Sequence, residues 1–195
     1  MSGRASIFDA LYVGNPDPWS VLTSPYERGK YAATLAALSR PAYAATLEIG
    51  CSIGVMTRAL GAVSGRVVAL DVSAVALAAA TTRCAGLPVT FLQAEVPGGW
   101  PEGTFDLIVL SEVLYFLDPE EVAACAALTA RTLAPDGEAV LVNWLGPTDT
   151  PLTGEAAAER FAAAASSDGL TATTVARAPF YRIDRLSRAP GRTGS

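Results

Sequence analysis

The apolar positions of the chain form two alternating patterns, short continuous runs typical of buried strands and longer stretches with helical spacing. The runs predict strands at residues 47–50, 67–71, 89–93, 105–110 and 139–144. The helical stretches fall between them, at residues 55–62, 74–84 and 119–133. This alternation indicates an α/β fold with a doubly wound, mainly parallel sheet that is covered by helices on both faces.

Further elements are predicted on either side of this core. Ser24, Pro25 and Glu27 form a capping box with proline at the first helical position, which predicts a helix from residue 25 to about residue 38. After the core, a loop rich in glycine and proline precedes one helix and two strands, predicted at residues 155–165, 171–176 and 180–186. We expect a single domain over residues 1–195, with residues 1–40 as a helical lid and residues 187–195 as a flexible tail.

Composition narrows the class of protein. The chain has 195 residues, of which 51% are hydrophobic and 17% are charged, which is enough apolar material for a full core. The net charge is −5, and no basic run is dense enough to neutralise a phosphate backbone. The first 19 residues lack the apolar run of a signal peptide, and no run reaches the roughly 18 residues of a membrane span. We therefore expect a soluble, cytoplasmic monomer that acts on a small molecule, not on nucleic acid or a membrane.

The cysteines do not predict a metal site. Cys51, Cys84 and Cys125 are widely spaced, without a CxxC pair, and the chain has no histidine to complete a zinc site. We expect reduced thiols and no metal.

The candidate chemistry begins where the first core strand ends. Glu48 lies on that strand, and Gly50 and Gly54 follow where the chain must turn tightly and a ligand must approach the backbone. Asp71 ends the second strand at the edge where a doubly wound sheet opens, so its carboxylate can accept both hydroxyls of a ribose. Together these residues predict a nucleoside ligand.

The glycine spacing distinguishes between two such ligands. A nicotinamide dinucleotide needs GxGxxG, in which the second glycine lets the pyrophosphate approach the backbone. Here the pattern is GxxxG, with Ser52 and Ile53 in between. S-adenosyl-L-methionine has no phosphate, and its ammonium group suits the carbonyls of this loop and the negative field of Glu48. The spacing favours S-adenosyl-L-methionine and leaves a nicotinamide oxidoreductase as the alternative.

Several motifs resemble those of known methyltransferases. The motif series of class I S-adenosylmethionine-dependent methyltransferases is similar to residues 48–54, Asp71, residues 105–110 and residues 111–117. More narrowly, the nodulation protein S (NodS) family resembles this chain nearly end to end, at residues 17–19, 24–27, 47–54, 143–144 and 151–154. The resemblance implies a Rossmann-like sheet of seven strands with the last strand antiparallel. It also implies N-methylation of an amine, which in the nodulation protein belongs to a deacetylated chito-oligosaccharide.

The residues and the resemblance together define a candidate cosubstrate site. We expect Glu95 to accept a hydrogen bond from the adenine amino group between Ala94 and Val96, although the family often has aspartate at that position. Lys30 can meet the cosubstrate carboxylate. The full set of expected cosubstrate contacts is Trp19, Tyr26, Lys30, Glu48, Gly50, Cys51, Gly54, Asp71, Val72, Ala94, Glu95, Val96 and Ser111.

The acceptor site is predicted less directly. A hydroxyl acceptor needs a base matched to neutral pH, usually histidine, whereas an amine acceptor only has to be neutral. The absence of histidine therefore favours an amine, as in an amino sugar or a natural-product intermediate. The candidate catalytic residues are Glu112, Tyr115 and Asn143, at the open end of the sheet. An O-methyltransferase and a non-catalytic protein that binds S-adenosylmethionine remain alternatives.

Overall fold

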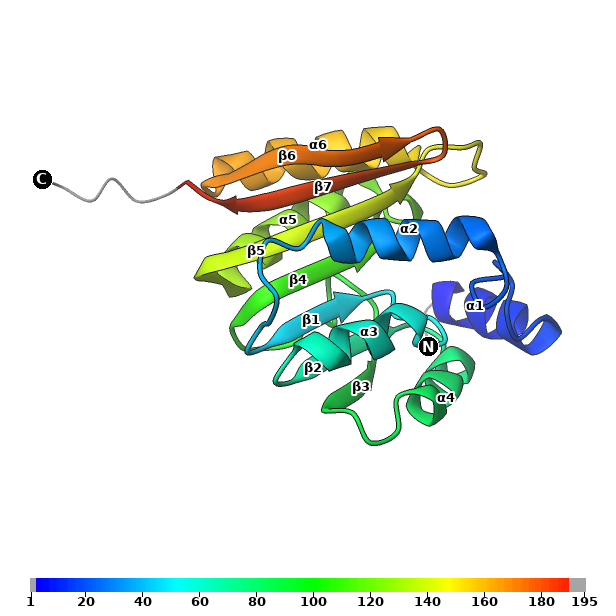
Figure 1. The fold of residues 1–195 in the computed structure, drawn as a ribbon. Coiled ribbons are helices and arrows are strands. Elements are labelled where there is room, and N and C mark those ends of the chain that lie inside the picture. The colour runs from blue at the N-terminus through cyan, green and yellow to red at the C-terminus, as the bar shows by residue number, and fades with distance from the viewer. Residues whose placement is uncertain (1–2, 190–195) are drawn as a thin grey trace, which may run out of the picture.

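A sheet of seven strands runs through the molecule in the order β3-β2-β1-β4-β5-β7-β6 (Figure 1). The computed structural model describes residues 3–189. The strands are β1 (Thr46–Ile49), β2 (Val67–Asp71), β3 (Val89–Gln93), β4 (Phe105–Ser111), β5 (Leu133–Trp144), β6 (Leu170–Ala178) and β7 (Tyr181–Arg188). The first five pair in parallel, and β7 pairs antiparallel with both β5 and β6. The predicted fold class, with its antiparallel last strand, is confirmed.

Helices cover both faces of this sheet. They are α1 (Gly3–Gly14), α2 (Pro25–Ala36), α3 (Val55–Val63), α4 (Ala74–Arg83), α5 (Pro119–Thr132) and α6 (Gly154–Ser167), with a short 3-10 helix, η1, at Leu114–Phe116. One buried cluster joins the sheet to α5 and α6, and a second joins it to α2, α3 and α4. Strand β5 contributes to both clusters: Leu141 belongs to the first, and Val140 and Val142 belong to the second. It can do so because successive side chains of a strand point to opposite faces of the sheet.

Two helix starts that the sequence marks differ in their caps. At α5, Asp118 accepts from the Glu121 amide and Glu121 accepts from the Asp118 amide, each at 3.0 Å, which completes a capping box. At α2, the Ser24 hydroxyl accepts from the Glu27 amide at 3.3 Å, but the Glu27 carboxylate pairs with Lys30 instead of reaching back. Only the Ser24 half of the predicted capping box is therefore present at α2, and the Glu27 carboxylate is available for its pair with Lys30.

The structure also departs from the expected elements at the two ends of the chain. The expected helical lid over residues 1–40 had no separate bounds for α1, in which apolar residues occur all around the helix and the exposed side carries Ile7, Leu11 and Val13. Strand β7 continues to Arg188, so Ser187 and Arg188 pair within the sheet where we expected the flexible tail to begin. The rest of that predicted tail, residues 190–195, lies outside the described residues.

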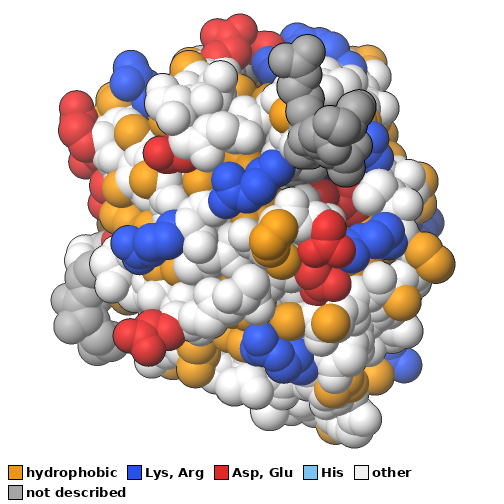
Figure 2. All heavy atoms as spheres, turned by 90° about the vertical axis from the view of Figure 1, so that its left-hand side faces the viewer, with side chains coloured by type: hydrophobic (Ala, Val, Ile, Leu, Met, Phe, Trp, Pro, Cys, Tyr) orange, Lys and Arg blue, Asp and Glu red, His pale blue; other side chains and the backbone are white. Residues whose placement is uncertain are grey.

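The face shown in Figure 2 is the left-hand side of Figure 1, opposite α1. Basic and acidic side chains alternate over it. Ion pairs link Arg40 with Asp106 at 3.5 Å and with Asp136 at 3.6 Å. Among residues 3–189, no helix is long and apolar enough to cross a membrane.

Candidate functional site

The turn after β1 opens the site. Gly50 has φ +81°, a left-handed backbone that favours glycine, and a Cβ there would lie 3.2 Å from the Ser111 carbonyl oxygen and clash with Val113. Ser52 follows with φ +50° and donates its amide to the Asp71 carboxylate at 2.8 Å. The loop is therefore folded tightly against the ends of β2 and β4, as the glycine pattern predicts.

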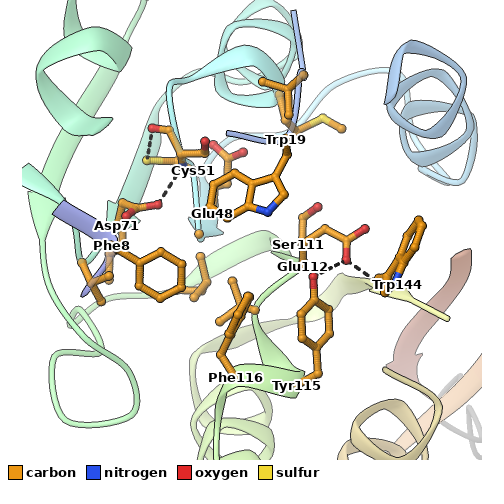
Figure 3. Close-up of a pocket in the computed structure, with 18 of the residues that line it drawn as sticks. Phe8, Trp19, Glu48, Cys51, Asp71, Ser111, Glu112, Tyr115, Phe116 and Trp144 are labelled. Carbon is orange, nitrogen blue, oxygen red and sulfur yellow. Dashed lines mark hydrogen bonds between the residues drawn. The ribbon is translucent and has the colours of Figure 1, made fainter. Parts of the chain in front are cut away.

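A cavity of about 570 Å³ lies at this edge of the sheet and is hereafter called the central cavity. It is bounded by the segments that follow β1, β2, β3, β4 and β5 and by α1 and α2. Figure 3 shows Asp71 and Phe8 at one end, Trp19 near the middle, and Glu112, Tyr115 and Trp144 gathered at the other end. We call these the Asp71 end and the Glu112 end.

At the Asp71 end, the Asp71 carboxylate accepts the amides of Ser52 at 2.8 Å and Ser73 at 2.9 Å. Burial raises the pKa of Asp71 above its usual range. Burial also raises the pKa of Glu48, to about 7, and the Glu48 Oε2 atom is buried without a hydrogen-bond partner. A carboxylate that is desolvated and incompletely paired is a strong attractor for a cationic group of a ligand.

At the Glu112 end, one carboxylate is fixed by three donors. Lys30 Nζ donates to Glu112 Oε1 at 2.6 Å, and the Tyr115 hydroxyl and the Trp144 amide donate to Oε2 at 2.8 and 2.9 Å. The Glu112 backbone has φ +59°, which is strained for a residue with a Cβ. Lys30, only 4% exposed, also pairs with Glu27 at 3.0 Å. Glu112 is therefore held in one orientation toward the cavity.

Helix α1 is docked on the loops around the Asp71 end. Arg4 pairs with Glu95 at 2.9 Å and also with Glu121. Asp9 accepts the Ser73 hydroxyl at 2.6 Å, and the Tyr12 and Ser52 hydroxyls are 2.5 Å apart. The helix thus contacts the segment after β1, the segment after β2 and the segment after β3.

Aromatic rings extend the cavity wall from α1 to the sheet. Phe8 meets Phe116 edge to face with 5.2 Å between ring centroids, and Tyr12 meets Trp19 in the same way at 5.5 Å. At the Glu112 end, Trp144 meets Tyr26 at 5.9 Å. These rings make the wall mainly apolar between charged groups at the two ends.

Most of the expected site residues meet in the central cavity. Its lining includes Trp19, Tyr26, Lys30, Glu48, Gly50, Cys51, Asp71, Val72, Ala94, Glu95, Val96, Ser111, Glu112 and Tyr115. Among the described residues, no group of histidine, cysteine, aspartate and glutamate side chains could hold a metal ion.

Two expected residues lie outside that lining. A Cβ on Gly54 would sit 2.9 Å from Ala80, so this glycine allows α4 to pack closely against the start of α3. Asn143 is fully buried on β5 and shares the face of Leu141, toward α6, while its neighbour Trp144 lines the cavity. The alternation of side chains along β5 therefore turns Asn143 away from the site.

The sequence predicts a lid over residues 1–40 but does not single out the α1 residues that line the cavity. Arg4, Phe8 and Tyr12 all line the cavity and follow one another at intervals of four residues, which places them on one face of a helix. This four-residue spacing indicates a shared helix face, but only if residues 3–14 are already known to be helical.

Known proteins resemble this chain in sequence and in fold. A family model for nodulation protein S (NodS) matches residues 11–143. Nodulation protein S of Rhizobium tropici is 34% identical over 128 residues, which are 64% of this chain and 53% of the relative. The chain thus spans about half the length of that curated relative.

Solved structures share the fold. N-methyltransferase NodS from Bradyrhizobium japonicum WM9, in complex with S-adenosyl-L-homocysteine, has a TM-score of 0.79 at 22% identity, covering 95% of this chain and 99% of that chain. A DhpI complex with SAH has a TM-score of 0.76 at 21% identity, covering 95% of each chain. At these identities, the likeness shows the fold alone.

Proposed function

The chain belongs to the nodulation protein S family, and from this premise we propose that it is an enzyme that transfers a methyl group from S-adenosyl-L-methionine to an amine nitrogen of a small molecule. When bound, S-adenosylmethionine supplies a methyl group on a positively charged sulfur: a nitrogen lone pair bonds to the methyl carbon while the carbon–sulfur bond breaks, and S-adenosylhomocysteine is the leaving group. The protein has to bind it, align the amine and exclude water.

The residues at the Asp71 end fit this cosubstrate. Asp71 would accept the ribose hydroxyls, and the negative field of Glu48, which also lines the cavity, would attract the ammonium group. The turn at Gly50 leaves backbone close to the cavity, where a Cβ would be excluded. Glu95 remains the proposed partner of the adenine amino group, although it already pairs with Arg4. We also propose that α1 acts as a lid over the bound cosubstrate.

The charge of the cavity lining supports a cationic acceptor. Its acidic residues are Glu27, Glu48, Asp71, Glu95 and Glu112, and its basic residues are Arg4 and Lys30. An excess of carboxylates in a partly enclosed, mainly apolar space favours positively charged ligands. Both S-adenosylmethionine and a protonated amine carry positive charge.

Glu112 supports the choice of an amine most directly. Three donors fix its carboxylate, so a remaining oxygen lone pair can bind an ammonium group in a defined direction. Glu112 or a water molecule beside it would take one proton from that ammonium, which leaves the nitrogen lone pair free to react. The absence of histidine from the chain is consistent with this route, because an amine needs no strong base.

Methyl-labelled S-adenosylmethionine tests the proposal. The protein would be incubated with it and a panel of small amines paired with the corresponding alcohols, and products would be located by mass spectrometry and NMR. We expect label on nitrogen. Label on oxygen would make the protein an O-methyltransferase, and binding of S-adenosylhomocysteine without any product would make it a non-catalytic binding protein.

A further inference from the structure

Lys30 is a buried cation in the lining of the central cavity, and it is the only lysine among the 14 lysine and arginine residues of the chain. The planar guanidinium of arginine presents a fork that suits one carboxylate, whereas an ammonium directs its three hydrogens to three separate points. Lysine at this one position therefore fits a cation that has to reach several groups at once.

The protein itself supplies partners for only part of this ammonium. Lys30 Nζ donates to Glu27 at 3.0 Å and to Glu112 at 2.6 Å, and within residues 3–189 these are the hydrogen bonds that it donates. An ammonium has three hydrogens, so one remains for a ligand in the cavity. The two carboxylates also share a single cation, which leaves this group of three side chains with an excess of negative charge.

The turn at Gly50, against which the proposed cosubstrate would lie, adjoins this ion pair. A Cβ on Gly50 would lie 3.2 Å from the carbonyl oxygen of Ser111, so the turn packs directly against that residue. Ser111 immediately precedes Glu112 in the chain. The amino-acid part of a cosubstrate at the turn is therefore a close neighbour of the pair between Glu112 and Lys30.

The other basic residue of the cavity lining is engaged elsewhere. Arg4 pairs with Glu95 at 2.9 Å and also with Glu121, which holds it at the Asp71 end. The amino-acid part of the cosubstrate carries its ammonium and its carboxylate on one carbon atom, so the carboxylate enters together with the ammonium that Glu48 attracts. Lys30 is the cation of the lining that is available to that carboxylate.

We propose that Lys30 is a positioning residue that couples the cosubstrate to the acceptor, by donating its third hydrogen to the cosubstrate carboxylate while it stays paired with Glu112. The ligand carboxylate then shares the charge of the ammonium, so the Glu112 carboxylate is less fully neutralised and attracts a cationic acceptor more strongly. Such coupling is reciprocal, and a bound acceptor strengthens cosubstrate binding by the same factor. This inference rests on the proposed function and adds to it that the acceptor binds best once the cosubstrate is in place.

Binding measurements on the wild type test the coupling without turnover. The affinity of cyclohexylamine is measured by NMR with S-adenosylhomocysteine, with decarboxylated S-adenosylhomocysteine and with neither ligand. Coupling between two sites typically amounts to about 5-fold or more. S-adenosylhomocysteine should therefore raise the affinity for cyclohexylamine by at least that factor, and the decarboxylated ligand should raise it much less.

A substitution on α2 assigns the effect to Lys30. Lys30→Met should make the two ligands equivalent in their effect on cyclohexylamine, and the matched control Arg28→Met, at an exposed position of the same helix, should retain the difference. Circular dichroism must show that Lys30→Met protein is folded. If it is not, the comparison of the two ligands on wild-type protein still decides whether the carboxylate carries the coupling.

Several outcomes would overturn the inference. They are equal enhancement by both ligands in the wild type, cyclohexylamine affinity that neither ligand changes, and a difference between the ligands that persists in folded Lys30→Met protein. Product analysis with labelled S-adenosylmethionine separates this idea from the proposed function. Coupling that depends on the carboxylate, without methylated amine, would sink only the proposed function, whereas methylated amine without coupling would sink only the role of Lys30. Neither amine binding nor methylated product would sink both.

Discussion

Lys30 Nζ lies 2.6 Å from Glu112 Oε1, so a helix that precedes the sheet and the end of β4 are joined by an ion pair between residues 82 positions apart. Because the side chain of Lys30 is 5% exposed and that of Glu112 is 22% exposed, the pair is mostly shielded from solvent. It fixes the carboxylate on which the proposed amine chemistry depends.

Replacing Glu112 by glutamine should lower kcat while leaving S-adenosylhomocysteine affinity within about twofold. The amide cannot take a proton from an ammonium group, and a positioned base contributes roughly 100-fold or more to such a step. Because solvent can also accept the proton, we expect a loss nearer 10-fold to 100-fold than complete inactivation. Steady-state kinetics and calorimetry measure the two effects, and exposed Glu102→Gln is the control. Unchanged kcat would remove Glu112 from the reaction.

Replacing Lys30 by methionine should destabilise the fold. The change leaves Glu27 and Glu112 close together without their shared cation. Breaking a fully buried pair costs about 3 to 5 kcal/mol, and partial exposure of Glu112 should reduce this to roughly 2 kcal/mol. Urea unfolding measures the loss, and Lys30→Arg, which keeps the charge, should be milder. Equal stability of wild type and Lys30→Met would show that the pair contributes nothing.

Replacing Asp71 by alanine should weaken S-adenosylhomocysteine binding at least about tenfold, since each charge-assisted hydrogen bond to a ribose hydroxyl is worth roughly 1.5 to 3 kcal/mol. The Asp71 carboxylate also holds the Ser52 and Ser73 amides, so circular dichroism must show that the fold persists. Exposed Asp136→Ala serves as the control. Normal affinity in folded Asp71→Ala protein would refute the assignment.

S-adenosylhomocysteine should bind more tightly as the pH rises from 6 to 8. Burial raises the pKa of Glu48 to about 7, so below that pH the carboxyl is neutral and attracts an ammonium group poorly. Because the folded pKa exceeds the unfolded one, the same group stabilises the free protein at low pH, and this contribution is lost as the pH rises through 7. Calorimetry in two buffers should detect proton release on binding. Glu48→Gln should abolish that release, and a wild-type affinity independent of pH would contradict the role of Glu48.

Replacing Arg4 by alanine should loosen the lid with little effect on global stability. Arg4 is partly exposed, and such pairs contribute at most about 1 kcal/mol. Yet it joins α1 to Glu95 and Glu121 across the Asp71 end, so S-adenosylhomocysteine should dissociate several times faster. Stopped-flow fluorescence of the nearby Trp19 can follow this release, with exposed Arg131→Ala as the control. Equal dissociation rates would show that Arg4 does not hold the lid.

The sequence predicts those parts of the fold that depend on local pattern. The core strands are continuous apolar runs, and the turn at Gly50 is marked by its glycines. The Lys30–Glu112 pair could not be predicted, because it depends on how α2 lies across the ends of β4 and β5. Asn143 lies near the end of a strand, as predicted, but its side chain is outside the cavity lining. Which of two neighbouring residues of a strand faces a cavity depends on how the strand is turned, and the apolar pattern alone does not give this.

The left-handed backbone at Glu112 has a consequence for how this position can change. A residue with a Cβ is destabilised by roughly 1 to 2 kcal/mol in that conformation relative to glycine. The pairs that the Glu112 carboxylate forms with Lys30 and with the Trp144 amide offset that cost. A glycine at this position would relieve the backbone but leave the Lys30 ammonium and the Trp144 amide without their partner, so the backbone conformation and the ion pair can change only together.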